Sequence, residues 1–257
     1  MSHVQEMERS TGARAEKAVE APPAVNPIAS GRVLPIVTYP AAVLREVCPL
    51  VPKEDYGGGG AGGVPASASE GAEAPPPPAL APWLDELVNN MRATLAFQDG
   101  MGLAAPQVGV SARVFVMRRC RKLQRARGEP LTRRSFEVCI NPRVRRAGER
   151  EDIGSEACFS LPQYDAFVRR PYTISAEWVD ETGTKRRETL QGLPAVVFQH
   201  ELDHLDGVLI LDKEVPGIAG TPAAAEAERR FDEGLERHYP SPLHRRQGAA
   251  PSRVDDV

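Results

Sequence analysis

The five residues His200 to His204, with the sequence HELDH, constrain this chain more than any other stretch. Side chains four residues apart lie on the same face of an α-helix, so both histidines can bind one metal ion. Glu201 lies beside that face, within reach of a water molecule. An H-E-x-x-H sequence on a helix is typical of metal-assisted hydrolysis with the glutamate as general base. A helix that presents two surface histidines is the alternative.

The residues around this motif favour a buried helix. Pro194 suits the first turn, where its missing N–H costs nothing. Residues 195–198 (AVVF) are apolar on every face, and Gly207 follows shortly after His204, where a helix would end. We therefore expect the motif on a helix in the core.

A catalytic metal site conventionally has a third protein ligand. The remaining histidines, His3, His238 and His244, lie in or near the termini. The third ligand is therefore a cysteine or a carboxylate. Cys158, in the stretch EACFS, is a candidate, although a buried and inert cysteine is the common fate of a lone one.

The stretch Gly100 to Gln107 (GMGLAAPQ) has small residues that allow another backbone, such as an extended peptide, to approach closely. Gln107 carries an amide that can donate to a developing oxyanion. A tight glycine-rich turn, with Gln107 as an ordinary polar residue, is the alternative.

An uneven distribution of 24 Pro and 22 Gly divides the chain. We predict a disordered N-terminal extension (1–30), a catalytic domain (31–235) and a disordered tail (236–257). The domain would contain a flexible insertion at about 53–80 and an exposed basic loop at 118–134.

Apolar spacing predicts a helix from Pro82 and a C-terminal helix from Pro222 to about His238. Strands are predicted at 33–37, at 113–117 and at 136–140, where Asn141-Pro142 would stop the last one. Residues 173–179 and 185–190 predict a hairpin that leads into the metal helix. The core face of the first helix should contain Leu84, Leu87, Val88, Met91 and Leu95.

Charge and cysteine usage exclude several classes of protein. A net charge of −3 argues against general nucleic-acid binding, and no apolar run approaches the length of a membrane span. No secretory signal opens the chain, and its four cysteines show no C-x-x-C pairing. We expect a cytoplasmic monomer that binds neither DNA nor membranes. The basic loop could make a transient ribosome contact, but a solvated loop is the simpler interpretation.

Three ordered motifs resemble those of the peptide deformylase family, which carries G-Φ-G-Φ-A-A-x-Q, E-G-C-Φ-S and Q-H-E-Φ-D-H, where Φ is apolar. Here they read GMGLAAPQ, EACFS and QHELDH. The resemblance implies an α+β fold in which antiparallel β-sheets pack around the central H-E-x-x-H helix. It also implies removal of the formyl group from the N-terminal formylmethionine of newly made polypeptides.

The resemblance assigns roles to individual residues. Cys158, His200 and His204 would bind one divalent metal ion. Fe²⁺ is expected, and Zn²⁺, Ni²⁺ or Co²⁺ could replace it in isolated protein. Glu201 would be the general base, and the Gln107 amide and the Phe159 backbone N–H would bind the oxyanion.

The substrate-binding residues also follow from the match to the family. Met101, Leu193 and Val197 would line the methionine pocket, and the substrate backbone would pair with the segments at Gly102 and Ala157. From their charges, we also expect Glu156 to pair with Arg170 and to fix the cysteine loop, with a surface ion pair as the alternative.

Two residues depart from the family pattern. Ala157 replaces the glycine before the cysteine, and its methyl group would narrow the cleft where the substrate backbone pairs. Asp165 stands where many bacterial members are basic, which would alter preference beyond the first residue.

Two rival functions stay open. An H-E-x-x-H metallopeptidase would take a downstream carboxylate, Glu226 or Glu228, as its third ligand. A structural metal module would need a closed four-ligand site.

Overall fold

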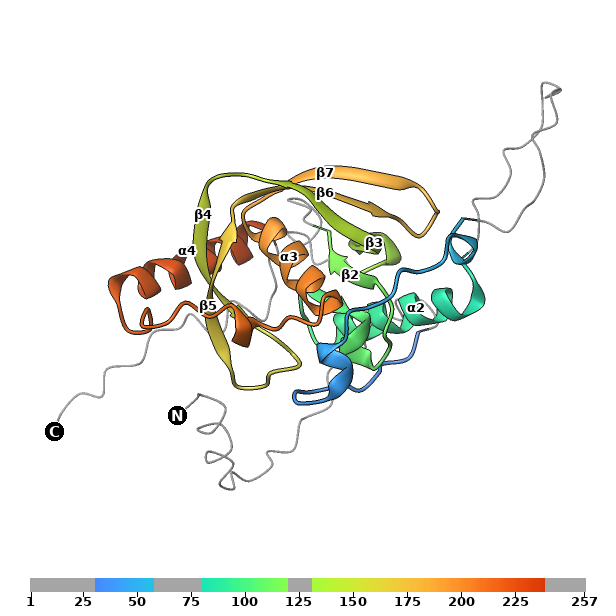
Figure 1. Cartoon of the computed structure of the whole chain (residues 1–257), viewed down its shortest axis with the longest axis horizontal. Coiled ribbons are helices and arrows are strands. Elements are labelled where there is room, and N and C mark those ends of the chain that lie inside the picture. Colours follow the sequence, from blue (N-terminus) through green and yellow to red (C-terminus); the bar gives the residue numbers. More distant parts are fainter. Residues whose placement is uncertain (1–30, 58–79, 120–130, 239–257) are drawn as a thin grey trace.

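The chain folds into two antiparallel sheets and a small number of helices (Figure 1). The structure is a computed structural model and describes residues 31–57, 80–119 and 131–238. The predicted extension at 1–30, most of the 53–80 insertion and most of the basic loop lie outside the described residues, as does most of the tail.

The larger sheet has five strands in the order β1-β2-β3-β6-β7, and every neighbouring pair is antiparallel. A second sheet pairs β4 with β5. The strands are β1 (Gly102–Ala104), β2 (Val114–Arg118), β3 (Phe136–Ala147), β4 (Glu151–Ala157), β5 (Asp165–Pro171), β6 (Thr173–Val179) and β7 (Lys185–Gln191). The predicted β6–β7 hairpin is confirmed.

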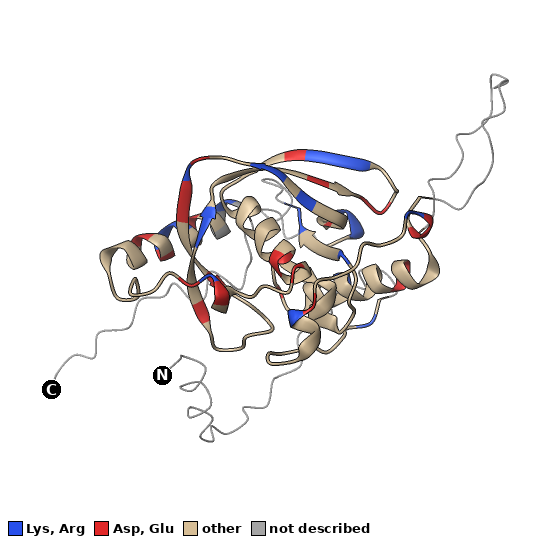
Figure 2. Cartoon of the chain, in the orientation of Figure 1, with Lys and Arg blue, Asp and Glu red and all other residues tan. Residues whose placement is uncertain are grey.

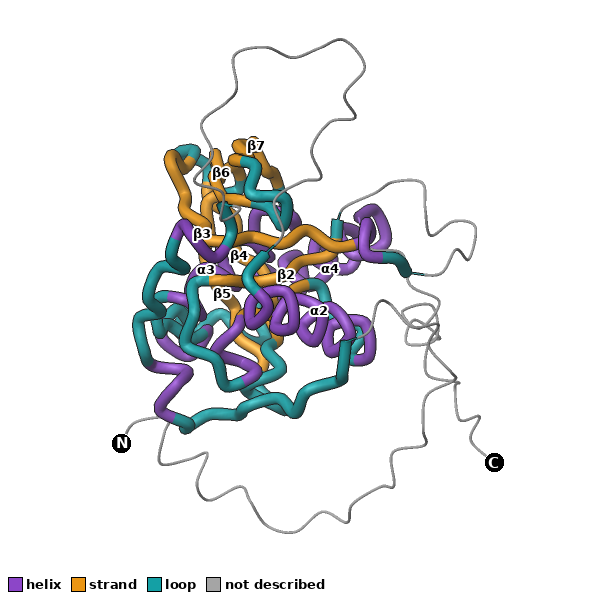
Figure 3. The backbone as a smooth tube through the Cα atoms, turned by 90° about the vertical axis from the view of Figure 1, so that its right-hand side faces the viewer, coloured by secondary structure: helices purple, strands orange, loops and turns teal. Residues whose placement is uncertain are grey.

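The helix α2 (Pro82–Phe97) covers one face of the larger sheet and lies beside β2 in two views (Figures 1 and 3). Its predicted apolar stripe is confirmed, because all five residues are buried: Leu84, Leu87, Val88, Met91 and Leu95. They form one core with residues of β2 and β3.

The helix α3 (Leu193–Leu205) carries the H-E-x-x-H motif and contacts strands of both sheets. Phe198 anchors it, because its ring lies 5.1 Å from the ring of Phe115 and 5.8 Å from that of Trp178. The C-terminal helix α4 (Pro222–His238) packs on β4 and α3. The predicted α+β class, with antiparallel sheets and a C-terminal helix, is confirmed.

Two strand predictions were wrong. Residues 33–37 form no strand, because their N–H groups bind elsewhere: Leu34 N–H donates to Thr94 Oγ1 of α2 at 2.9 Å, and Val37 N–H donates to the carbonyl of Gln107 at 2.8 Å. The strand β3 does not stop at Pro142 but continues through a bulge, where its register with β6 shifts after Ile140. Asn141 has a φ of 51° there, and its side-chain amide binds the backbone of Val51 in both directions. A bulge is where a sheet tolerates proline.

Three segment boundaries also differ from the prediction. Lys53–Asp55 form a short 3-10 helix, η2, rather than part of the flexible insertion. Arg118, assigned to the basic loop, ends β2; it is buried and forms an ion pair with Asp99. Helix α4 continues to His238, past the predicted domain end at 235.

Among the described residues, no helix is long and apolar enough to cross a membrane. Charged residues of both signs lie along β7 and α4 (Figure 2). On the larger sheet, Arg143 and Arg187 pair with Glu177 across neighbouring strands.

Thr94 gives a test of how α2 holds the segment before Val37. Thr94 is fully buried, and its hydroxyl accepts from Leu34 N–H and donates to the carbonyl of Asn90. We predict that Thr94→Val lowers the free energy of unfolding by about 1–3 kcal/mol, because the Leu34 N–H loses its partner.

Urea denaturation followed by circular dichroism measures this loss. Thr189→Val, at an exposed position of β7, is the matched control and should change stability by about 0.5 kcal/mol or less. Equal effects of both variants would contradict the prediction.

Candidate active site

The three predicted metal ligands come together from two elements. Cys158 follows the end of β4, and His200 and His204 lie one turn apart on α3. Their ligand atoms all lie within 4.8 Å of one another, and the Cys158 sulfur is 3.3 Å from His204 Nε2. A thiol and two imidazoles at this separation are a donor set that suits a divalent transition metal.

His200 is oriented by a buried carboxylate. Glu156, on β4, lies 2.9 Å from His200 Nδ1, which leaves Nε2 free to bind a metal. The Arg170 guanidinium donates to both Glu156 oxygens, at 2.5 and 2.8 Å. Burial opposes ionisation of Glu156, but the hydrogen bonds from Arg170 and His200 outweigh it and lower its pKa to about 2. The predicted Glu156–Arg170 pair is present, and it is buried rather than at the surface.

The same guanidinium connects this strand pair to α3. Arg170 Nη1 donates to Asp203 Oδ2 at 2.7 Å, and Lys213 Nζ lies 2.7 Å from the other Asp203 oxygen. Asp203 therefore holds the helix in place and does not line the cavity described below.

His204 is neutral in its surroundings. Burial lowers its pKa well below the ordinary value. Its Nδ1 is buried with no hydrogen-bond partner among the described residues. A neutral imidazole is the form that binds metal.

Glu201 is buried next to the strand that carries the glycine-rich motif. Burial raises its pKa to about 7, and its Oε2 has no hydrogen-bond partner in the described part of the chain. A Cβ atom at Gly102 would lie 2.3 Å from Glu201 Oε1, so only glycine fits beside this carboxylate. A carboxyl group with a pKa near neutrality can both accept and donate a proton.

Gln107 points its amide nitrogen at the cysteine. It lies in η3 (Ala105–Val108), where its Oε1 accepts from the backbone N–H of Ala104 at 2.9 Å. This bond directs Nε2 toward the Cys158 sulfur, 3.6 Å away, and toward Ser160 Oγ, 3.3 Å away. The side chain is fixed as a donor and is not a loose polar group in a turn.

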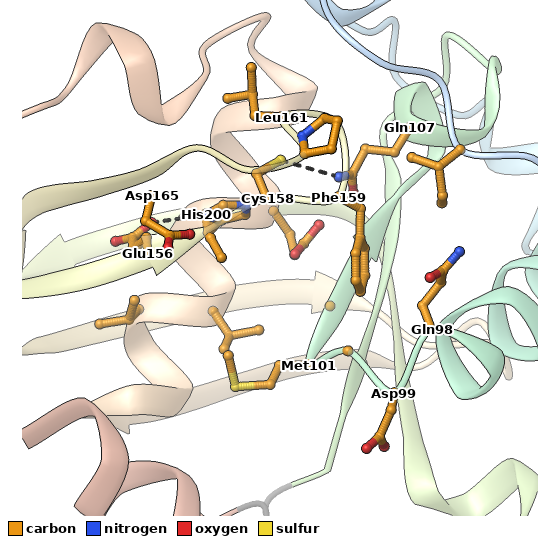
Figure 4. A pocket seen from close by; sticks show the side chains of 18 of the residues that line it. Gln98, Asp99, Met101, Gln107, Glu156, Cys158, Phe159, Leu161, Asp165 and His200 are labelled. Carbon is orange, nitrogen blue, oxygen red and sulfur yellow. Dashed lines mark hydrogen bonds and ion pairs between the residues drawn. The ribbon is translucent and has the colours of Figure 1, made fainter. Parts of the chain in front are cut away.

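These groups face a cavity of about 500 Å³ (Figure 4). The predicted residues that line it are Met101, Gly102, Gln107, Glu156, Ala157, Cys158, Phe159, Val197, His200 and Glu201. Its charged lining residues are Asp99, Glu156, Asp165 and Glu201, and no Lys or Arg is among the described residues of this lining.

The predicted role of Leu193 in the methionine pocket stays a prediction. Leu193 lines a smaller hollow next to this cavity and packs against α4, where a Cβ at Gly234 would lie 3.4 Å from it. Val196 and Phe231 line the cavity instead, and sequence analysis missed both. Val196 could have been found, since it precedes His200 by one helical turn. Phe231 lies on α4, and no local signal connects it to the site.

The rival carboxylate ligands are elsewhere. Glu226 pairs with Arg229 and Arg230 on α4, each at 2.8 Å, and Glu228 is exposed. Neither belongs to the group of ligand atoms around Cys158.

The site combines a buried carboxylate with three side chains that can bind a metal. These are the groups that metal-assisted hydrolysis requires. Comparison with known proteins identifies the family. The family model described as polypeptide deformylase matches residues 76–217. The chain belongs to the polypeptide deformylase family.

Individual relatives agree with this assignment. A peptide deformylase of Rhizorhabdus wittichii is 42% identical over 129 residues, which cover 50% of this chain and 71% of that protein. One of Thermotoga neapolitana is 37% identical over 133 residues, 52% of this chain and 73% of that protein.

Solved structures share the fold. A Met-Ala-Ser-bound class I type b peptide deformylase from Acinetobacter baumannii superposes with a TM-score of 0.54 at 26% identity, covering 70% of this chain and 98% of that one. Peptide deformylase from Thermotoga maritima superposes with a TM-score of 0.53 at 29% identity, covering 72% of this chain and 99% of that one.

Arg170 offers a test of how the site is held. Arg170 and Glu156 are 3% and 4% exposed, so removing the guanidinium leaves a buried carboxylate without its cation. We predict that Arg170→Met lowers the free energy of unfolding by about 3–5 kcal/mol.

The measurement is urea denaturation in the presence of a chelator, so that bound metal does not contribute. Arg187→Met, which breaks an exposed pair with Glu177, is the control. It should lower the free energy of unfolding by about 1 kcal/mol or less. A loss below 1 kcal/mol for Arg170→Met would contradict the prediction.

Proposed function

We propose that this chain removes the formyl group from the N-terminal formylmethionine of newly made polypeptides, and that the cavity at Cys158 is where it does so. The products are formate and a free N-terminal methionine. The observation that supports this most directly is the convergence of Cys158, His200 and His204 beside the buried carboxylate of Glu201. Membership of the polypeptide deformylase family supports the same reaction.

Cys158, His200 and His204 would hold the divalent metal ion on which this family depends. The Nε2 of buried His204, 3.3 Å from the Cys158 sulfur, and the carboxylate that orients His200 fit a metal site, since carboxylates commonly orient the histidines that bind a metal. We propose Fe²⁺ as the resident ion, with Zn²⁺, Ni²⁺ or Co²⁺ able to replace it. When bound, such an ion supplies a Lewis acid that makes water a stronger nucleophile near neutral pH.

Glu201 would transfer the proton in the reaction. Its carboxylate accepts a proton from the water whose oxygen attacks the formyl carbon. When the C–N bond then breaks, the same group delivers that proton to the departing amine nitrogen. Its raised pKa, about 7, suits a group that must both take and return a proton.

Two donors would bind the oxygen of the formyl group as it gains negative charge. One is the Gln107 amide nitrogen, which its bond to Ala104 directs toward Cys158. The other is the backbone N–H of Phe159, the residue after the cysteine. Losing one such donor typically costs about 3 kcal/mol of transition-state stabilisation.

The substrate would lie extended between β1 and β4. We propose that its backbone pairs with the segments at Gly102 and Ala157, and that its methionine side chain enters beside Met101 and Val197. Ala157, where the family pattern has glycine, narrows this cleft by one methyl group.

A cytoplasmic location and a monomeric state, both proposed here from sequence alone, stay predictions. So does a transient ribosome contact through the basic loop, because residues 120–130 lie outside the described part of the chain.

Formate release tests the reaction directly. We expect purified protein, loaded with Fe²⁺ without oxygen, to release formate from formyl-Met-Ala-Ser. Glu201→Gln should lower kcat by at least about 100-fold, because the amide cannot accept the proton. Gly102→Ala should also lower it, because its methyl group displaces the same carboxylate.

A protein that releases no formate from any formyl-Met peptide would overturn the proposed function. Full turnover by Glu201→Gln would overturn the role of Glu201 alone. Its metal content, measured by atomic emission, should match the wild type, and this shows that the ligands are intact.

Metal binding tests the ligand set separately. We expect Co²⁺-loaded protein to show sulfur-to-cobalt charge-transfer absorption, since Cys158 would supply a thiolate. Cys158→Ala should lose this absorption, whereas Cys48→Ala, at a buried cysteine outside the ligand group, should keep it. Retained absorption in Cys158→Ala would exclude this thiol as a ligand.

A further inference from the structure

A second hollow of about 230 Å³ lies behind the proposed active site. Most of its apolar lining comes from four elements: Ile153 of β4, Val168 of β5, Leu193 of α3 and Ala227 of α4. Three residues line both this hollow and the main cavity, namely Glu156, Val196 and Phe231. The two spaces are therefore adjacent and share a wall.

The two spaces follow one another along the helix α3, because residues on successive turns line first one and then the other. His200 and Glu201 face the main cavity, and Val196 and Val197 face it one turn earlier along the helix. Leu193, about one turn earlier again, faces the second hollow. At 1.5 Å per residue, Leu193 lies about 6 Å beyond Val197 along the helix axis. A side chain that entered beside Val197 and continued along α3 would point toward the second hollow.

Of the shared residues, Phe231 is the one best suited to separate the spaces. Glu156 is held by Arg170 and His200, and Val196 belongs to the wall of α3. Phe231 is a half-buried aromatic side chain that comes from α4, on the far side, and is the α4 residue in the lining of the main cavity. Its ring packs against the core that includes Leu193 and Val197.

The second hollow has room for apolar atoms. A Cβ atom placed on Gly154, whose residue lines the hollow, would meet no other heavy atom within 4 Å. Of the charged side chains in the lining, Arg150 and Arg230 are largely exposed and are paired with Asp152 or Glu226, and the buried Arg170 and Glu156 are bonded to each other, so these charges are already paired. The interior would therefore suit an unbranched hydrocarbon chain.

We propose that Phe231 closes the methionine pocket and sets the maximum length of the N-terminal side chain that the enzyme accepts. This inference rests on the proposed function, because it concerns the side chain of the formylated residue. Without the ring, the two spaces join and the enzyme accepts longer unbranched apolar side chains.

The test compares two substrates in wild-type and variant enzymes. One is formyl-Met-Ala-Ser, and in the other 2-aminooctanoic acid, whose side chain is two heavy atoms longer, replaces methionine. We expect Phe231→Ala to raise the ratio of kcat/KM for the longer substrate to that for the methionine substrate by about tenfold, because two further methylene groups leave water. Phe231→Leu, which keeps an apolar contact with α3, should move the ratio in the same direction by less.

Two further variants separate length control from a general loosening of the site. Ile153→Ala shortens a lining residue of the second hollow that the main cavity does not share, so it should leave the ratio unchanged. Adding Gly154→Val to Phe231→Ala should return the ratio toward the wild-type value, because valine fills the space.

The possible outcomes separate the proposed function from the role of Phe231. Wild-type enzyme that hydrolyses neither substrate would overturn the proposed function and this inference with it. Wild-type enzyme that hydrolyses the methionine substrate, while both Phe231 variants leave the ratio unchanged, would overturn only the role of Phe231. A shift in Ile153→Ala as large as that in Phe231→Ala would also overturn it.

Discussion

The buried guanidinium of Arg170 is the interaction on which the arrangement of the site depends. It binds Glu156 on β4 and Asp203 on α3, so one planar group joins the smaller sheet to the helix. Glu156 in turn fixes the ring of His200. Since Cys158 follows β4 and both histidines lie on α3, the separation of the proposed ligands depends on this connection. A charge is costly to bury, and here Arg170, Glu156 and Asp203 each have at least one opposite partner.

The position of the catalytic groups in the cavity depends on the close approach of the β1 backbone to Glu201 as much as on charge. The backbone of β1 passes so close to Glu201 that residue 102 has no room for a side chain. Gln107 is fixed by the N–H of Ala104, at the end of the same strand. A short strand and the single turn of 3-10 helix that follows it therefore position both the proposed base and one oxyanion donor. Preorganised groups of this kind avoid reorganisation during the reaction.

Local sequence signals predicted most elements and most of the site. The stripe on α2, the β6–β7 hairpin and the motif helix each follow from spacing within a few residues, and the ordered motifs connected Cys158 to the two histidines. Features that depend on distant contacts could not be read in this way. Pro142 remains inside β3 because Asn141 binds Val51, ninety positions earlier in the chain. Leu193 packs on α4, which has no sequence signal for the cavity, and the same helix supplies Phe231.

The lining of the main cavity contains four acidic residues and no Lys or Arg among its described members. Glu156 and Asp99 have basic partners, but Asp165, opposite Ala157 on the strand pair, is exposed at the entrance. The charge of an exposed carboxylate such as Asp165 acts over about a Debye length, before any contact forms. Asp165 would therefore attract polypeptides with basic first residues at low ionic strength, and added salt would weaken this attraction. The order in which the enzyme meets its substrates would then depend on their charge as well as on their abundance.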